Sequence, residues 1–358
     1  MGGVGEPGSE LLVSRAARAV GLDGVAERAG YPGGGAYLYV VSLLVLDQVV
    51  LSGIQYVRYG THPALAFPLW FVPPIAVIAG LRATRHLVRT YEDARGTLRE
   101  RATNPEPLER PLAPVRLQVA LYVALLAGGV FFFFLQPGMW AARVDLVGTA
   151  LFPVKFAVVF AGLYYPVVAE AAGVLIGTFL LVPRRLVRAG VDLDFGDRVR
   201  LCGLRDVGRL IGRATQVYFG GLFVYTVVAF APRIFPSQPT PAPGSIVSAV
   251  FLAAWIAGFV LFSIPTVWLH REMRRQKRAR LETIQARLAE HGEHDERIPD
   301  RPAAGEIDDY LYFQLALDSV ERTREYPTDA GLLRDLVVSA VPSMVTYASA
   351  FLVGLLQF

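Results

Sequence analysis

The sequence has few charged residues, almost no lysine and a single cysteine, and each shortage excludes a class of protein. Only 18% of its 358 residues are charged while 53% are hydrophobic, whereas a soluble domain carries about 25% charged residues. This composition excludes an ordinary soluble enzyme and a disordered chain. Cys202 alone cannot form an intrachain disulfide or a cysteine-rich metal site. The first 35 residues are rich in glycine and lack the apolar core of a signal peptide.

Lysine occurs only at positions 155 and 277, so arginine supplies almost all of the 35 basic residues. The arginines are spread among several hydrophilic segments, and the net charge is only +4. A nucleic-acid-binding surface needs a concentrated basic patch, so we expect no nucleic-acid partner. The arginine bias is instead typical of a GC-rich genome, and we expect a prokaryotic source.

Apolar runs of about 20 residues recur along the chain and predict seven transmembrane helices. The strands of a β-barrel would alternate over about 10 residues, so the expected fold class is an all-α integral membrane protein. The fourth run is long enough to project beyond the bilayer. The expected spans are residues 36–57, 63–81, 117–135, 151–181, 217–235, 246–269 and 332–358.

The arginines predict the orientation of these spans. The linkers after the second, fourth and sixth spans are rich in arginine, whereas the alternate loops carry one arginine each. The positive-inside rule places the rich linkers in the cytoplasm. The N-terminus, with Arg15, Arg18 and Arg28, is then cytoplasmic too, and an odd number of spans leaves the C-terminus outside. We therefore expect a multi-pass protein of the plasma membrane, with arginines that contact anionic lipid headgroups.

The charged linkers divide the chain into four expected parts. Residues 1–35 form a cytoplasmic segment with an amphipathic helix over 11–29. Residues 36–269 form a six-helix transmembrane bundle with cytoplasmic linkers. Residues 270–331 form a cytoplasmic helical anchor region, in which the sixth helix continues to about 290 and another helix covers 306–325. Residues 332–358 form the seventh helix.

Three ionisable residues fall within the expected spans, where a charge is costly and marks a functional site by default. Asp47 lies near the middle of the first span, and Lys155 and Glu170 lie in the fourth. A proton or coupling-ion site built from Asp47 and Glu170 is one interpretation. The others are a structural pair, a group that faces a watery vestibule and, for Lys155, a side chain that extends outward to the interface.

The last span carries polar and small side chains at three- and four-residue steps, which places them on one face of a helix. Such a stripe suits either a seam between helices or the lining of a water-filled pore, and Pro342 would bend the helix. The expected pore-lining residues are Ser343, Thr346, Ser349, Val353, Leu356 and Gln357.

Motifs of soluble enzymes are missing from the sequence. The glycine-rich stretch 203–212 lacks the Lys and the Ser or Thr of a P-loop. His291 and His294 have metal-like spacing, but they stand in a polar stretch without cysteine, which favours a solvated loop. We therefore expect no enzyme activity, no cofactor and no metal.

The organisation resembles the insect gustatory and odorant receptor class, which belongs to a wider superfamily of seven-transmembrane ion channels. The resemblance rests on the seven spans, their orientation, a chain that ends within the last helix, and the closing pairs Thr346-Tyr347 and Gln357-Phe358. Insect gustatory receptors close with Thr-Tyr, about five hydrophobic residues and Gln-Phe. Here nine residues, ASAFLVGLL, separate the two pairs, and the extra four add about one helical turn.

The resemblance implies a homotetramer whose four final helices line a central cation pore. It also implies a subunit anchor formed by the cytoplasmic ends of helices four to six and the segment before helix seven. A small-molecule ligand pocket is implied in the outer half of the bundle. We therefore expect a homotetrameric cation channel, either ligand-gated or constitutively open. The alternatives are a secondary transporter coupled to protons through Asp47 and Glu170, and a non-transporting sensor or scaffold whose cytoplasmic helices recruit a partner.

Overall fold

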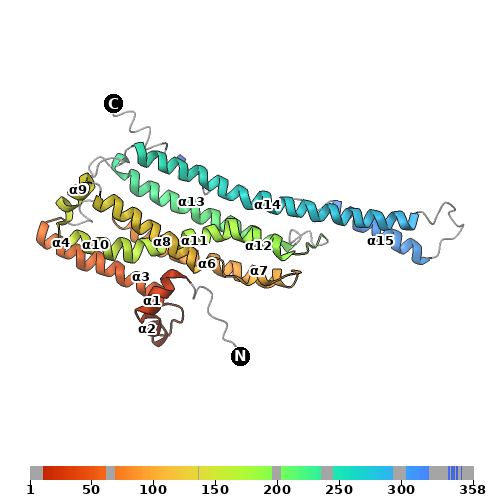
Figure 1. Cartoon of the computed structure of the whole chain (residues 1–358), viewed down its shortest axis with the longest axis horizontal. Coiled ribbons are helices and arrows are strands. Elements are labelled where there is room, and N and C mark those ends of the chain that lie inside the picture. The colour runs from red at the N-terminus through yellow and green to blue at the C-terminus, as the bar shows by residue number, and fades with distance from the viewer. Residues whose placement is uncertain are drawn as a thin grey trace.

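The computed structural model of the chain is an elongated bundle of helices with a narrow projection at one end (Figure 1). It describes residues 11–61, 69–135, 137–195, 203–234, 245–292 and 304–321, together with residues 338, 340–342, 344, 345 and 348. Within these residues there is no strand, and one isolated β-bridge joins Ala102 to Val191. The expected all-α fold is therefore confirmed for this part of the chain.

Several of the helices contain stretches of the wider π-helix, labelled η. In chain order the elements are α1 (Leu12–Ala19), α2 (Leu22–Arg28), α3 (Gly35–Val45), η1 (Leu46–Leu51), α4 (Ser52–Tyr59), α6 (Val72–Arg99), α7 (Glu106–Glu109), α8 (Val115–Val130), η2 (Phe131–Leu135), α9 (Pro137–Val147), α10 (Leu151–Lys155), η3 (Phe156–Tyr164), α11 (Tyr165–Ile176), η4 (Gly177–Leu181), α12 (Val182–Ala189), α13 (Arg205–Ile234), α14 (Ser245–Gly292) and α15 (Ala304–Glu321).

Four helices of the described chain are long and apolar enough to cross a membrane, as expected of a membrane protein. They are Gly35–Tyr59, Val115–Leu135, Leu151–Ala189 and Ser248–Arg287, and they coincide with the first, third, fourth and sixth expected spans. Helix α6 begins within the second expected span, and α13 covers most of the fifth. The seventh expected span lies largely outside the described residues.

Helix α14 is far longer than a bilayer requires. Its 48 residues span about 72 Å at 1.5 Å per residue, against a hydrocarbon core of about 30 Å. Its second half is rich in arginine and packs against α15. We call residues 270–292 of α14 together with α15 the stalk, which projects from the bundle in Figure 1. The expected extension of the sixth helix is confirmed. The helix expected over 306–325 is present over Ala304–Glu321, and residues 322–325 lie outside the described part of the chain.

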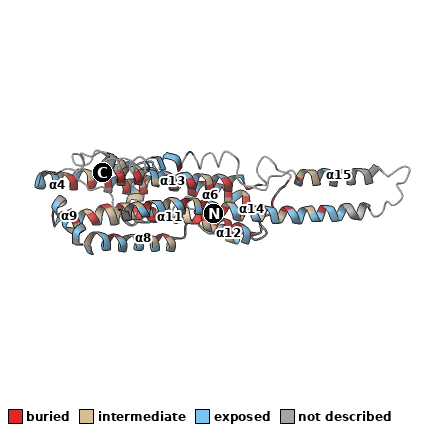
Figure 2. Ribbon diagram, turned by 90° about the horizontal axis from the view of Figure 1, so that it is seen from above, coloured by how far each residue is buried: buried red, intermediate tan, exposed pale blue. Residues whose placement is uncertain are grey.

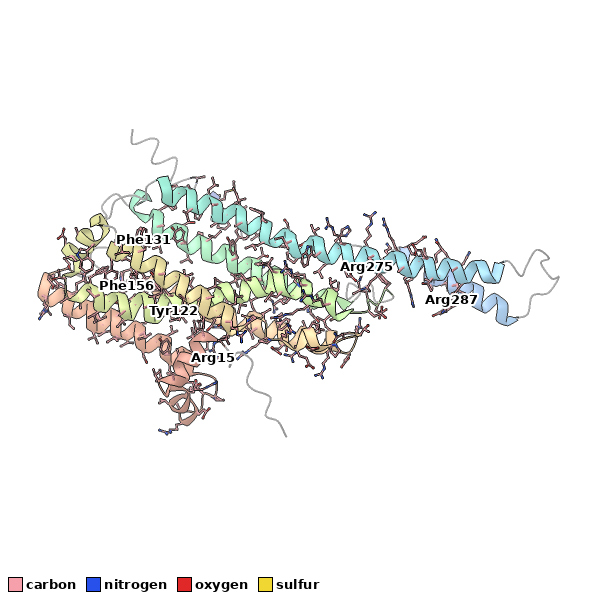
Figure 3. All side chains as sticks on the ribbon, viewed as in Figure 1. Arg15, Tyr122, Phe131, Phe156, Arg275 and Arg287 are labelled. Atoms are coloured by element: carbon pink, nitrogen blue, oxygen red, sulfur yellow. The ribbon has the colours of Figure 1, made fainter. Side chains whose placement is uncertain are left out.

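Arginines are concentrated in the stalk part of α14, and a run of phenylalanines lies at the opposite end of the molecule. Figure 3 places Arg275 and Arg287 on the stalk, and Phe131 and Phe156 at the opposite end of the bundle. Figure 2 shows exposed residues along α14 where it leaves the bundle. This polarity matches a protein with one end embedded in hydrocarbon and the other in water.

The largest buried core lies next to the stalk and includes residues of α6, α7, α12 and α13. Helix α7 packs against α6 and α12, and α6 packs against α13. We call these four segments the base. Arg185 of α12 is buried there and donates to the carbonyl oxygens of Arg110 at 2.9 Å and Pro111 at 3.0 Å. It also donates to the Tyr91 hydroxyl at 3.3 Å. Burial raises the pKa of Tyr91, and the neighbouring Arg185 opposes that rise.

The expected amphipathic helix over 11–29 is broken into two helices. Gly21 lies between them with a φ of +77°, a conformation that glycine adopts without strain. Both helices pack against α3, and α1 also packs against α11. The buried face of α1 carries Val13, Ser14 and Ala17, so this segment is docked on the bundle through a specific face.

Candidate functional site

Two separate polar clusters are buried among the apolar helices. The three ionisable residues expected within the spans, Asp47, Lys155 and Glu170, are divided between them. Asp47 and Lys155 belong to the first cluster, and Glu170 belongs to the second. Asp47 is 7% exposed and Glu170 only 1%. Buried charges need partners because each unpaired charge costs several kcal/mol, so the partners of each group define what it can do.

The first cluster holds Lys155 at the point where α3–η1–α4 meets α10. The ammonium nitrogen donates to Gln55 Oε1 at 2.7 Å and to Ser52 Oγ at 3.2 Å. It lies 3.9 Å from Asp47 Oδ1, while Gln48 Nε2 donates to the other carboxylate oxygen at 2.5 Å. Lys155 is therefore directed into the bundle. Two neutral acceptors hold it at hydrogen-bonding distance, and the carboxylate balances its charge from slightly farther away.

Both charges of this first cluster lie at π-helical turns. Asp47 is the second residue of η1, and Lys155 directly precedes η3. A π-turn adds a residue to the helical repeat and is frequent at functional sites. The first turn, η1, contacts α10, the helix that ends at Lys155. The apolar pattern of the sequence does not reveal these turns.

An aromatic cluster lies near the first polar cluster, where η2 packs against η3, the segment that follows Lys155. Phe133 and Phe134 of η2 pack against Phe160 and Phe156 with ring centroids 4.9 Å apart in each pair. Such contacts contribute about 0.5–1.5 kcal/mol each beyond their burial. Phe131 and Phe156 are labelled at this end in Figure 3. Our sequence reasoning did not single out this cluster, although four consecutive phenylalanines at 131–134 were a visible signal.

The second cluster binds the N-terminal end of α1 to the bundle. Helix α1 has no side-chain cap of its own. Instead Glu170 Oε2 accepts a hydrogen bond from the backbone N–H of Val13, and Gln118 Oε1 accepts one from Leu12, both at 2.8 Å. A carboxylate at a helix N-terminus satisfies free N–H groups and interacts favourably with the helix dipole. Glu170 thus caps a helix more than 150 residues earlier in the chain.

Arg85 extends this second cluster to the loop before α3. Its guanidinium donates to Ser14 Oγ at 2.6 Å and to the Gly33 carbonyl at 3.1 Å, and it stacks over the Tyr37 ring. Arg85 Nε and Glu170 Oε1 are both buried, and neither has a hydrogen-bond partner among the residues that the structure describes. The cluster therefore joins α1, α3, α6 and α11. One donor nitrogen and one acceptor oxygen in it could each form a further hydrogen bond.

The contacts do not bring Asp47 and Glu170 into one site. Asp47 pairs with Lys155 and Gln48, whereas Glu170 caps α1. A shared coupling site needs both carboxylates to face one ion, and their partners lie on different helices. The pair of Asp47 and Lys155 is the arrangement that the structure supplies.

The expected pore-lining residues, Ser343, Thr346, Ser349, Val353, Leu356 and Gln357, all lie outside the described residues. The described positions of that segment are helical. Across the described ranges, no group of three or more His, Cys, Asp or Glu side chains gathers as a metal site would require.

No family model, curated protein or solved structure matches this chain.

Proposed function

We propose that this chain is a homotetrameric cation channel of the plasma membrane whose last helix lines a central pore. In this proposal the chain crosses the membrane seven times. The four long apolar helices are joined by α6, α13 and the final segment, with the N-terminus and the stalk in the cytoplasm and the C-terminus outside. Membership of the seven-transmembrane channel superfamily, remote from its insect members, is part of the proposal.

The exposure of the few described residues of the final segment carries this proposal. Ala340 is 3% exposed and belongs to the main core, whereas Val341, Met344 and Val345 are about half exposed. These exposed side chains leave a face of the segment available to neighbouring copies, and a polar stripe such as the sequence carries is unfavourable wherever it meets lipid. Symmetric copies that assemble around an axis would cover the stripe and surround a polar path.

The stalk supports the same assembly. A helical pair that carries many arginines beyond the apolar half of α14 suits an aqueous position on the cytoplasmic side. There it would hold neighbouring copies together without contributing to the membrane-spanning surface. The proposed pore and the proposed anchor therefore occupy separate parts of each copy.

Substitutions of Gln357 test the proposed pore. In planar bilayers with a potassium chloride gradient, Gln357→Arg should abolish or invert the cation preference because a ring of four positive charges repels cations. Gln357→Glu, the matched variant of opposite charge, should strengthen that preference. Reversal potentials that stay the same in both variants would place the pore elsewhere.

A second candidate function is a proton-coupled transporter, and the buried pair of Asp47 and Lys155 favours it. Charged residues inside a membrane bundle commonly mark proton relays. In proteoliposomes with a trapped pH-sensitive dye, Asp47→Asn should then abolish proton flux. Ser52→Ala, which removes a neutral acceptor, should leave most of the flux. A wild-type protein that moves no protons would remove this candidate.

A further inference from the structure

A groove runs between α6 and α13, near the middle of α6. Its volume is about 310 Å³, at the lower end of the range of typical ligand sites. It is lined by Ala83, His86, Leu87, Arg213, Gln216 and Val217. Because half of these side chains are apolar and the other half are polar or cationic, the groove suits an amphipathic ligand.

The groove lies where two of the expected spans meet the inner membrane surface. The second expected span ends at residue 81 and the fifth begins at residue 217, so Ala83 and Val217 mark the membrane side of the groove. Arg213 comes four residues before Val217, about 6 Å farther from the hydrocarbon at 1.5 Å per residue. In the proposed topology the apolar end of the groove therefore faces acyl chains, and its cationic end lies at the depth of the headgroups.

Arg213 is held across the groove by α6. Its Nη1 donates to Thr90 Oγ1 at 2.8 Å, and this hydroxyl donates to the carbonyl of His86 at 2.9 Å. The arginine side chain is nevertheless exposed, and no carboxylate of the described residues forms an ion pair with it. Arg82 and Arg89 are also exposed, next to the lining residues of α6. A guanidinium in a fixed orientation with donors to spare matches a phosphate group.

The carboxylates nearest the groove on these two helices are mostly engaged. Asp206 pairs with Arg209 at 3.4 Å, and Glu92 pairs with Arg95 at 3.1 Å. Asp93 lies about two turns beyond the lining residues of α6, toward the C-terminal end of that helix. The exposed arginines beside the groove therefore outnumber the available carboxylates of α6 and α13, and this excess of positive charge favours an anionic ligand.

The membrane side of the groove continues into an apolar surface. On α6, Ala79 is exposed about one turn before Ala83, and Ile75, a further turn away, is 59% exposed. On α13, Gly220 is exposed, and a Cβ there would meet no atom within 4 Å. This surface has room for an acyl chain beside the apolar end of the groove, which a soluble phosphate would not use.

We propose that this groove binds one anionic phospholipid of the inner leaflet. Its phosphate lies on Arg213, the amide of Gln216 bonds the ester oxygens, and an acyl chain passes Ala79 and Gly220. Basic pockets between transmembrane helices on the cytoplasmic side bind lipid headgroups in this way. The proposal rests on the proposed topology, in which α6 and α13 enter the bilayer, but it does not depend on a pore or on four copies.

Photolabelling of the full chain in phosphatidylcholine nanodiscs tests this proposal. The probes are phosphatidylglycerol and phosphatidylcholine, each present as a trace and carrying the same diazirine near the start of one acyl chain, and mass spectrometry maps the labelled peptides. The phosphatidylglycerol probe should label residues 75–87 and 213–220 more strongly than the phosphatidylcholine probe does. Arg213→Met should reduce this labelling roughly tenfold, as expected for the loss of a charge-assisted hydrogen bond.

Two further variants locate the site. Ala83→Trp fills the groove and leaves Arg213 in place, so labelling by phosphatidylglycerol should fall here too. Arg116→Met is the matched control, because Arg116 is exposed at the start of α8, beside the inner end of the third expected span, and does not line the groove. Labelling of α6 and α13 should persist in this variant.

The outcomes separate the lipid site from the topology. Equal labelling by both probes, or normal labelling in either groove variant, would overturn the lipid site and leave the topology intact. If neither probe labels α6 or α13, these helices lie outside the bilayer, and the proposal fails together with the seven-span arrangement. Displacement of the phosphatidylglycerol probe by glycerol 3-phosphate would also overturn the proposal, because it would assign the groove to a soluble phosphate ester.

Discussion

At the scale of single residues, Lys155 shows how a charge is accommodated among apolar helices. Its side chain is 13% exposed, and its ammonium group is satisfied by Gln55 and Ser52 as well as by Asp47. Removing one member of a buried pair costs far more than replacing both, because the remaining charge keeps its desolvation cost and loses its partner.

Lys155→Met should therefore destabilise the protein by about 3–5 kcal/mol, measured by chemical unfolding in detergent. The double variant Asp47→Asn with Lys155→Met should recover much of this loss, since neither charge then remains buried. Two single effects that simply add in the double variant would show that Asp47 and Lys155 are not energetically coupled.

At the scale of elements, α1 depends on the bundle for its first turn. Its cap comes from Glu170 and Gln118, which lie on other helices, and Arg85 holds Ser14 in the same turn. The two N-terminal helices are thus fastened by side chains of the membrane bundle. The position of α1 therefore depends on how α11, α8 and α6 pack together, because Glu170, Gln118 and Arg85 belong to those helices.

Glu170→Ala should release the first turn of α1, because a lost cap costs about 0.5–2 kcal/mol. Hydrogen exchange of the peptide over residues 11–20, followed by mass spectrometry, should accelerate by roughly tenfold, the equivalent of 1.4 kcal/mol. Glu170→Gln keeps an acceptor oxygen and should accelerate exchange less. Unchanged exchange in both variants would mean that α1 is held by its apolar face alone.

At the scale of the whole molecule, Phe131 and Phe156 lie at one end of the chain, and Arg275 and Arg287 lie on the stalk at the other (Figure 3). The base lies between them and holds the largest buried core. Because that core sits beside the stalk, the part proposed to lie in the cytoplasm is a folded unit rather than a set of loops.

Electron-microscopy class averages of the protein in nanodiscs should show fourfold particles with the stalks projecting from one side. In the proposed channel the polar stripe of the final segment is covered by neighbouring copies, and closed rotational symmetry supplies them. Monomers or twofold dimers would exclude the tetrameric pore and would favour the transporter that uses Asp47 and Lys155.

Much of the helical framework could be predicted from the sequence. Apolar runs of about 20 residues located the four helices that are able to span a membrane. The helical composition of residues 270–290 predicted that α14 continues beyond the sixth span. These features are local, because helix formation and hydropathy depend on residues close together in the chain. The division of the N-terminal segment at Gly21 was missed because a glycine inside a helical pattern is often tolerated.

The sequence by itself determined the helical class, the apolar lengths and which residues are unusual for their surroundings: Asp47, Lys155 and Glu170. Only the tertiary structure decided their partners, assigning Lys155 to Asp47, Ser52 and Gln55, and Glu170 to the first turn of α1. The groove beside Arg213 was decided at the same level. The reason is physical: a hydrogen bond between groups about 100 residues apart depends on how helices pack and on π-turns that shift their register, and neither is encoded in a local pattern.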